Sequence, residues 1–191
     1  MSITTVAGFD PASLRNIGWC LIKVHEDGAG AMQAFEPFAG TFVLSHVEEP
    51  WKALWPMFMV TDAFLSKEKP DLVVVEKTSS FSGGFITGQV SNCLGVILAC
   101  CGKLNIPVTF VYPSHVKKVI VGKGKATKNQ MKKAVETILE DLTGTTIKYD
   151  SEHAYDALAN VLCWMMEKGF VEQTNDDDKS EHGEPNGEEE T

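Results

Sequence analysis

The chain has 191 residues, of which 43% are hydrophobic, and a formal net charge of −9 at pH 7. This length is enough for one domain with a substantial core. No apolar stretch approaches the ~20 residues that a membrane-spanning helix needs. The N-terminus also lacks the basic region and the long apolar run of a secretory signal. We therefore do not expect a membrane-spanning or secreted protein.

The negative charge is concentrated near the C-terminus. Residues 172–190 contain nine acidic residues and one lysine, whereas the rest of the chain has 17 acidic and 16 basic residues. No apolar residue follows Val171, so this segment cannot bury a core. We expect one domain over residues 1–170 and a disordered acidic tail over residues 171–191. The tail serves solubility or, alternatively, competes with nucleic acid for the domain.

Cysteine usage points to a reducing compartment. The five cysteines are odd in number, form no Cys-x-x-Cys motif and lie mostly in apolar runs. Small buried thiols fit this pattern, and we do not expect a zinc site.

The first part of the chain predicts three strands and a helix. Short apolar runs over residues 4–10, 18–24 and 37–45 are separated by turn residues. Their short connections indicate an antiparallel meander. Residues 51–69 have a helical apolar rhythm, which Pro70 ends because the residue before a proline avoids helical angles.

The second part alternates strands and helices. We predict strands over residues 72–76 and 106–111, with a helix over residues 85–104 between them, and this alternation indicates parallel pairing. Three further helices are expected, which begin at Pro113, after Thr127 and after Ser151 and end near Val121, Leu142 and Lys168. Thr127 and Gln130 have the spacing of a capping box, and Ser151 is a candidate N-cap. The order predicts an α/β fold with a mixed five-stranded sheet flanked by helices.

Three acidic residues stand at the ends of predicted elements. Asp10 follows an apolar strand and precedes Pro11, Glu76 ends the run from Leu72, and Asp156 lies among small apolar residues of the last helix. Open α/β sheets place their sites at the carboxyl ends of strands. We therefore expect one divalent-metal site.

Oxygen-rich sites of this kind suit Mg²⁺. Two ions about 3.5–4 Å apart activate a water for attack on phosphorus and stabilise the leaving oxygen. His153 lies three residues before Asp156, so both share a helix face, and its imidazole is expected to bind metal or position water. The alternative is an ordinary polar residue near a helix N-terminus, with Asp150 or Glu152 completing the metal site.

A basic segment indicates contact with phosphates. Residues 113–133 contain no acid and seven lysines, namely Lys117, Lys118, Lys123, Lys125, Lys128, Lys132 and Lys133. Such a segment neutralises a nucleic-acid backbone, although a solvated helix face is the alternative. Lys117 or Lys118 is expected to stabilise charge near the reacting phosphate.

Several motifs together resemble a known family. The segments that begin at Gly8, Val75, Gly88, Tyr112 and His153 follow one another as in the RuvC-type Holliday junction resolvases, which belong to the RNase H-like nuclease superfamily. The segments read Gly8-Phe9-Asp10-Pro11-Ala12-Ser13, Val75-Glu76-Lys77, Gly88-Gln89, Tyr112-Pro113-Ser114-His115-Val116-Lys117-Lys118 and His153-x-x-Asp156-Ala157-Leu158-Ala159. The resemblance spans residues 6–166. Many members carry aspartate where this chain has His153, and the divergence is compatible with a phage or viral member.

The resemblance implies an RNase H-like fold and a homodimer that cuts four-way DNA junctions by paired symmetric nicks, in DNA recombination and repair. It implies two Mg²⁺ ions, or Mn²⁺ in their place, held by Asp10, Glu76, His153 and Asp156. From the basic segment, Lys118 is expected to be a further catalytic residue. It also implies a cytoplasmic or nucleoid-associated protein, or one in the host cytoplasm if viral.

DNA contacts are expected from one arginine, one aromatic residue and five lysines. Arg15 is the only arginine, and a surface ion pair is its alternative role. Phe81, between serines and glycines, is expected to stack on bases or else to fold onto the core. The expected DNA-binding residues are Arg15, Phe81, Lys117, Lys118, Lys123, Lys125 and Lys128.

Three alternative functions remain open. The same chemistry serves a broader nuclease for forks and flaps, and the same fold serves a junction-binding protein that does not cleave. An actin-like ATPase or sugar kinase also opens with an aspartate after a strand, but it needs two large lobes and a longer chain.

Overall fold

The computed structural model describes residues 2–13, 15–26, 32–77 and 85–171. Phe81 and residues 172–191, which make up almost all of the expected acidic tail, lie outside the described residues. The elements in chain order are β1 (Ser2–Asp10), β2 (Asn16–Glu26), β3 (Met32–Val43), a 3₁₀ helix (Pro50–Ala53), α1 (Leu54–Glu68), β4 (Leu72–Glu76), α2 (Phe85–Leu104), β5 (Val108–Val111), α3 (Pro113–Val121), α4 (Lys128–Thr143) and α5 (Glu152–Glu167).

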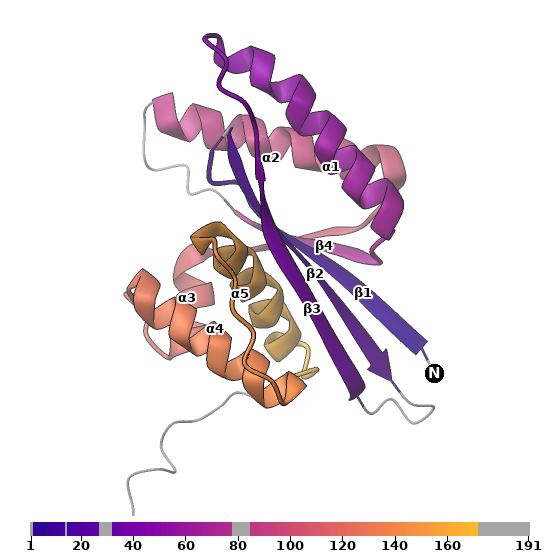
Figure 1. Cartoon of the computed structure of the whole chain (residues 1–191), viewed down its shortest axis with the longest axis vertical. Coiled ribbons are helices and arrows are strands. Elements are labelled where there is room, and N and C mark those ends of the chain that lie inside the picture. The colour runs from indigo at the N-terminus through magenta and orange to yellow at the C-terminus, as the bar shows by residue number, and fades with distance from the viewer. Residues whose placement is uncertain (1, 14, 27–31, 78–84, 172–191) are drawn as a thin grey trace, which may run out of the picture.

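The sheet has the strand order β3-β2-β1-β4-β5. The first three strands pair antiparallel, whereas β4 pairs parallel with both β1 and β5. Helices α1 and α2 cover one face of the sheet, and α3, α4 and α5 cover the other (Figure 1). The predicted mixed five-stranded α/β fold is therefore confirmed.

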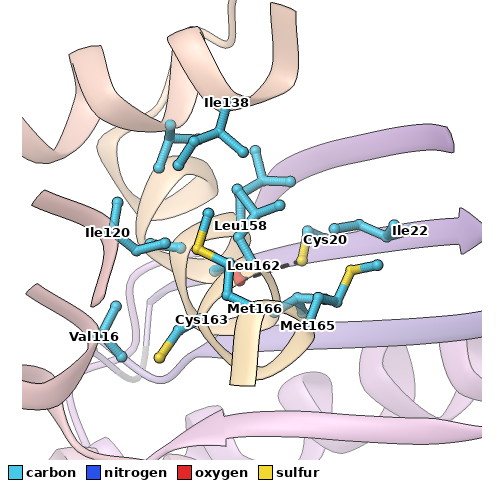
Figure 2. Packing of buried hydrophobic residues seen from close by; sticks show 14 of the residues in the cluster. Cys20, Ile22, Val116, Ile120, Ile138, Leu158, Leu162, Cys163, Met165 and Met166 are labelled. Atoms are coloured by element: carbon cyan, nitrogen blue, oxygen red, sulfur yellow. Dashed lines mark hydrogen bonds between the residues drawn. The ribbon is translucent and has the colours of Figure 1, made fainter. Parts of the chain in front are cut away.

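Alternating side chains of β1 separate two cores. Val6 belongs to the cluster shared with α3, α4 and α5, while Ala7 and Phe9 belong to the cluster shared with α1 and α2. Figure 2 shows Leu158 and Leu162 of α5 in the first cluster. All five cysteines are free and buried. None of the helices within the described ranges is long and apolar enough to cross a bilayer.

Two glycines let α5 approach the sheet closely. A Cβ atom at Gly8 would lie 2.7 Å from the carbonyl oxygen of Ala157, and one at Gly18 would overlap the backbone carbonyl of His153. Both contacts are tighter than packed atoms tolerate, so a side chain at either position would push α5 away. Because Gly18 pairs with Asp10 in the sheet, this approach also sets the distance between Asp10 and the start of α5.

The local signals for α4 are confirmed. The Thr127 side chain accepts a hydrogen bond from the backbone N–H of Gln130, and the Gln130 side chain accepts one from the N–H of Thr127 at 2.9 Å. This reciprocal pair satisfies two N–H groups that the first turn of a helix leaves without partners.

Two expectations were wrong in detail. Strand β3 begins at Met32, five residues before Pro37, and it lies at the edge of the sheet, where a proline without an N–H to donate is tolerated. The Ser151 side chain does not cap α5, although Ser151 occupies the N-cap position. Its hydroxyl instead forms a hydrogen bond with the hydroxyl of Thr41, and so connects α5 to β3.

Candidate active site

Parallel pairing brings two acidic residues to one edge of the sheet. Phe9 lies opposite Val75 in the register of β1 and β4, so the next residues, Asp10 and Glu76, emerge side by side at the carboxyl ends of these strands. The first two turns of α5 add His153 and Asp156. These four residues line one open cleft of about 250 Å³.

Asp10 and His153 form the best-defined contact of the cleft. Nδ1 of His153 lies 3.0 Å from Oδ2 of Asp10, and Asp10 is only 8% exposed. This hydrogen bond raises the pKa of His153, against the opposing effect of partial burial. The donor atoms of Asp10, His153 and Asp156 all lie within 4.8 Å of one another, which is close enough to share a metal ion.

The other two carboxyl groups of the cleft, those of Glu76 and Asp156, are harder to ionise than carboxyl groups in water. Burial, reinforced by the charges of Asp10 and Asp156, raises the pKa of Glu76 to about 7. Burial and the charge of Asp10 likewise raise the pKa of Asp156 to about 6. Neighbouring negative charges in a partly buried cleft raise the free energy of ionising Glu76 and Asp156, and a bound cation would lower it.

Two lysines reach the cleft. Lys117 of α3 lines it and lowers the pKa of Glu76, in opposition to the larger effect of burial. Lys128, the first residue of α4, also lines it and lies 2.7 Å from Glu152. The cleft therefore combines carboxylates with ammonium groups, an arrangement that is chemically able to bind a divalent cation and a phosphate together.

The other expected DNA-binding residues lie outside the cleft. Lys118 on α3 and Lys123 and Lys125 in the following loop are exposed and do not line it. Arg15 is also exposed, in the turn between β1 and β2. The position of Phe81 is outside the described part of the chain.

The two acids considered as alternatives to His153 are not in the cleft either. Asp150 is exposed and lines a neighbouring depression with Tyr149 and Tyr155. The Glu152 carboxylate pairs with Lys128, which lowers the pKa of Glu152. The structure thus places His153, and neither alternative acid, in the cleft with Asp10, Glu76 and Asp156.

Sequence reasoning overlooked Asn160. This residue is 1% exposed, lines the cleft and donates a hydrogen bond from Nδ2 to the carbonyl oxygen of Phe9 at 3.3 Å. It ties α5 to the residue before Asp10. The sequence feature that could have identified Asn160 is a single amide side chain in an apolar helical run, one turn after Asp156.

A lysine and tyrosine pair was also overlooked. Lys77 follows Glu76 directly, and its Nζ donates a hydrogen bond to the Tyr112 hydroxyl at 3.1 Å while lying 5.1 Å from the ring centre. Tyr112 is 54% exposed. The pair adds an exposed aromatic ring and a cation at the end of β5.

Comparison with known proteins gives the chain a family. Residues 6–164 match the family model described as crossover junction endodeoxyribonuclease RuvC. The RuvC of Syntrophomonas wolfei is 32% identical over 159 residues, which cover 83% of this chain and 86% of that protein. The RuvC of Petrotoga mobilis is 37% identical over 95 residues, which are 50% of this chain and only 56% of that relative.

Solved structures share the fold. Thermus thermophilus RuvC in complex with a Holliday junction substrate matches with a TM-score of 0.70 at 20% identity, over 88% of this chain and 98% of that one. The yeast mitochondrial Holliday junction resolvase matches with a TM-score of 0.60 at 10% identity, over 87% and 81%. As the RuvC-like motifs predicted, the chain belongs to the RuvC family of crossover junction endodeoxyribonucleases.

Proposed function

We propose that this member of the crossover junction endodeoxyribonuclease family resolves four-way DNA junctions by paired symmetric nicks, through Mg²⁺-dependent phosphodiester hydrolysis. The observation that carries the proposal is the assembly of Asp10, Glu76, His153 and Asp156 in one cleft beside Lys117. These residues come from β1, β4, α5 and α3, so only the folded chain forms the site.

The donor set fits hard divalent cations. Three carboxylates and one imidazole offer oxygen-rich coordination with room for water, which Mg²⁺ prefers and Mn²⁺ accepts. The raised pKa values of Glu76 and Asp156 indicate a surplus of negative charge that two such ions would neutralise. When bound, the ions supply a more acidic water and stabilisation of the leaving oxygen.

The side chains around this centre have separate proposed roles. Lys117 and Lys128 attract the scissile phosphate and balance charge that develops on it. Asp10 holds the His153 ring through Nδ1. In the tautomer with a proton on that atom, Nε2 keeps a lone pair with which to bind metal or accept a proton.

The proposed DNA surface continues from the cleft along α3 and its following loop. The exposed Lys118, Lys123 and Lys125 carry positive charge in that direction and position phosphates without reading bases. Arg15 would bind a phosphate beyond the turn after Asp10. The stacking role of Phe81 remains a prediction from sequence.

A homodimer completes the proposal, with α2 as the interface. Gly88, Asn92, Gly95, Ala99 and Gly102 are exposed and recur at alternating spacings of four and three residues. Such a stripe of small residues lets two helices approach closely. We propose that a second copy of this chain packs against this stripe, because paired nicks on a two-fold symmetric junction need two active sites related by the same symmetry.

An exposed aromatic patch adjoins this stripe. Trp51, Trp55 and Phe58 form an apolar groove with Val96, the neighbour of Gly95 on α2, and Trp51 and Trp55 are 64% and 67% exposed. Exposed aromatic residues of this size are typical of interfaces. The patch would enlarge the contact between the two copies.

The test is cleavage of a mobile four-way junction beside matched duplex, fork, flap and RNA–DNA hybrid substrates, with Mg²⁺ or with chelator. We expect symmetric nicks confined to the junction, and their loss by at least about 10²-fold in Asp10→Asn and Glu76→Gln. Glu48→Gln, at an exposed acid outside the cleft, is the matched control and should retain activity. Cuts spread over forks and flaps would replace junction resolution with a broader branched-DNA nuclease, and junction binding without cuts would refute catalysis.

A further inference from the structure

A second group of metal-binding side chains lies between α3 and α5, outside the acidic cleft. His115 stands in the first turn of α3, while Cys163 and Glu167 are one turn apart on α5. The imidazole nitrogen, the sulfur and a carboxylate oxygen all lie within 4.8 Å of one another. None of the three residues lines the cleft that holds Asp10 and Glu76.

The separations fit a tetrahedral ion after a small adjustment. Ligand atoms with metal bonds of about 2.0–2.3 Å lie roughly 3.3–3.8 Å apart in such a site. His115 Nε2 and Glu167 Oε1 are now 2.6 Å apart in a direct hydrogen bond. Their side chains are 44% and 43% exposed, so both can rotate outward to admit an ion.

The buried sulfur distinguishes this group from a surface ion pair. A histidine and a glutamate on neighbouring helices would by themselves form an ordinary exposed pair of little consequence. Beneath them, however, Cys163 is 0% exposed. Figure 2 shows Cys163 on the side of α5 that faces Val116 of α3, in the same core cluster. The three donors thus form a site with a buried floor and an open mouth.

We propose that His115, Cys163 and Glu167 bind one divalent ion of the zinc class, with water as the fourth ligand. Binding releases the thiol proton of Cys163 to solvent and forms a metal–sulfur bond in its place. It also replaces the hydrogen bond between His115 and Glu167 with two metal–ligand bonds. The combination of sulfur and nitrogen selects against Mg²⁺, so this site and the acidic cleft take different ions.

The position of the site gives it a structural consequence. His115 is two residues before Lys117, and Cys163 lies two turns beyond Asp156 on α5. A bound ion would therefore fasten the helix that carries Lys117 to the helix that carries His153 and Asp156. Such a fastening limits how far Lys117 can move relative to the acidic residues.

Cobalt titration of the metal-free full chain tests the proposal, since tetrahedral Co²⁺ with a thiolate ligand has a sulfur-to-metal charge-transfer band and strong visible bands. We expect one equivalent of Co²⁺ to produce both. Asp10→Asn, which alters only the cleft, should keep the bands, and so should Cys101→Ala, which removes a buried thiol of α2. Cys163→Ala should abolish the charge-transfer band.

Two surface variants keep the test independent of folding. Removing a residue that only hydrogen-bonds to a metal ligand costs about 10–100-fold in metal affinity. Removing a ligand itself, in His115→Gln or Glu167→Gln, should therefore weaken Co²⁺ binding at least about tenfold. Zn²⁺ should raise the melting temperature of the wild type more than that of His115→Gln. A charge-transfer band that survives in Cys163→Ala, no band at excess Co²⁺, or equal stabilisation of both proteins would overturn the proposal. None of these outcomes depends on DNA cleavage.

Discussion

The imidazole of His153 lies 3.0 Å from the carboxylate of Asp10, although 143 positions of sequence separate the two residues. One stands at the end of β1 and the other in the first turn of α5. The contact joins the central strand of the sheet to the last helix of the described chain. It also places an imidazole, rather than a third carboxylate, against Asp10.

The acidic cleft should make the stability of the metal-free protein depend on pH. The pKa of Glu76 is raised from 4.5 to about 7, and that of Asp156 from 3.8 to about 6. The folded state therefore binds protons that the unfolded chain has already released, and the free energy of unfolding falls as the pH rises from about 4 to about 7. His153 acts in the same direction, because its raised pKa gives stability that is lost as the pH rises through the folded value.

Glu76→Gln should remove one part of this dependence. At pH 8 with chelator the variant should be more stable than the wild type by on the order of 1–3 kcal/mol, whereas at pH 4 the difference should be small. Urea unfolding followed by circular dichroism measures both values. Mg²⁺ should then stabilise the wild type more than the variant. The same difference at both pH values would contradict the electrostatic origin.

Lys117→Ala and Lys118→Ala form a matched pair. Lys117 lines the cleft and Lys118 does not, so only the first should lower the single-turnover rate constant at saturating junction, by about 10²–10³-fold. Lys118→Ala should weaken binding and reduce the salt dependence of affinity by about one phosphate contact. The reverse pattern would show that Lys118 is the lysine near the scissile phosphate.

Gly18→Ala should disturb the site without touching a charged group. The added methyl would overlap the backbone carbonyl of His153, which we expect to cost on the order of 1–3 kcal/mol of stability and to reduce cleavage as α5 shifts. Thr137→Ala is the control, because Thr137 is exposed on α4 and lies outside both the cleft and the proposed dimer interface. That change should be neutral or stabilise α4 by up to about 1 kcal/mol. Equal effects of both changes on melting temperature and cleavage would contradict the close approach of α5 to Gly18.

The proposed dimer interface predicts a change in mass. Gly95→Glu places a charge in the exposed stripe of α2 and should convert a dimer into a chain of 20.9 kDa, as measured by light scattering after gel filtration. Thr137→Glu, at an exposed position of α4, should leave the dimer intact. A wild-type mass of one chain at micromolar concentration would rule out a stable dimer in the absence of DNA.

Local sequence signals were sufficient for much of the fold. The bounds of β4 and α2 follow from apolar runs limited by charged residues, glycines and prolines, and Thr127 with Gln130 marks the start of α4. Asp10 and Glu76 were recognisable because each ends an apolar strand, and parallel pairing then brings them together. These features depend on neighbours in sequence or on one simple rule of sheet topology.

Other features depend on contacts across the fold. Lys117 and Lys118 are adjacent on α3 and differ by about 100° around the helix, so only the packing of α3 decides which one reaches the cleft. The Ser151 hydroxyl prefers Thr41, 110 residues away, to the helix it precedes. No local pattern carries that preference, because the competing partner lies on another strand.

The last described helix completes the acidic site, and this has a consequence for the timing of synthesis. Asp10 and Glu76 leave the ribosome long before His153 and Asp156 do. A nascent chain that ends before α5 lacks two of the four proposed metal donors and the surface that covers β1 and β2. We therefore expect an incomplete translation product to be unable to cut DNA, so that the chain becomes active only when nearly the whole domain exists.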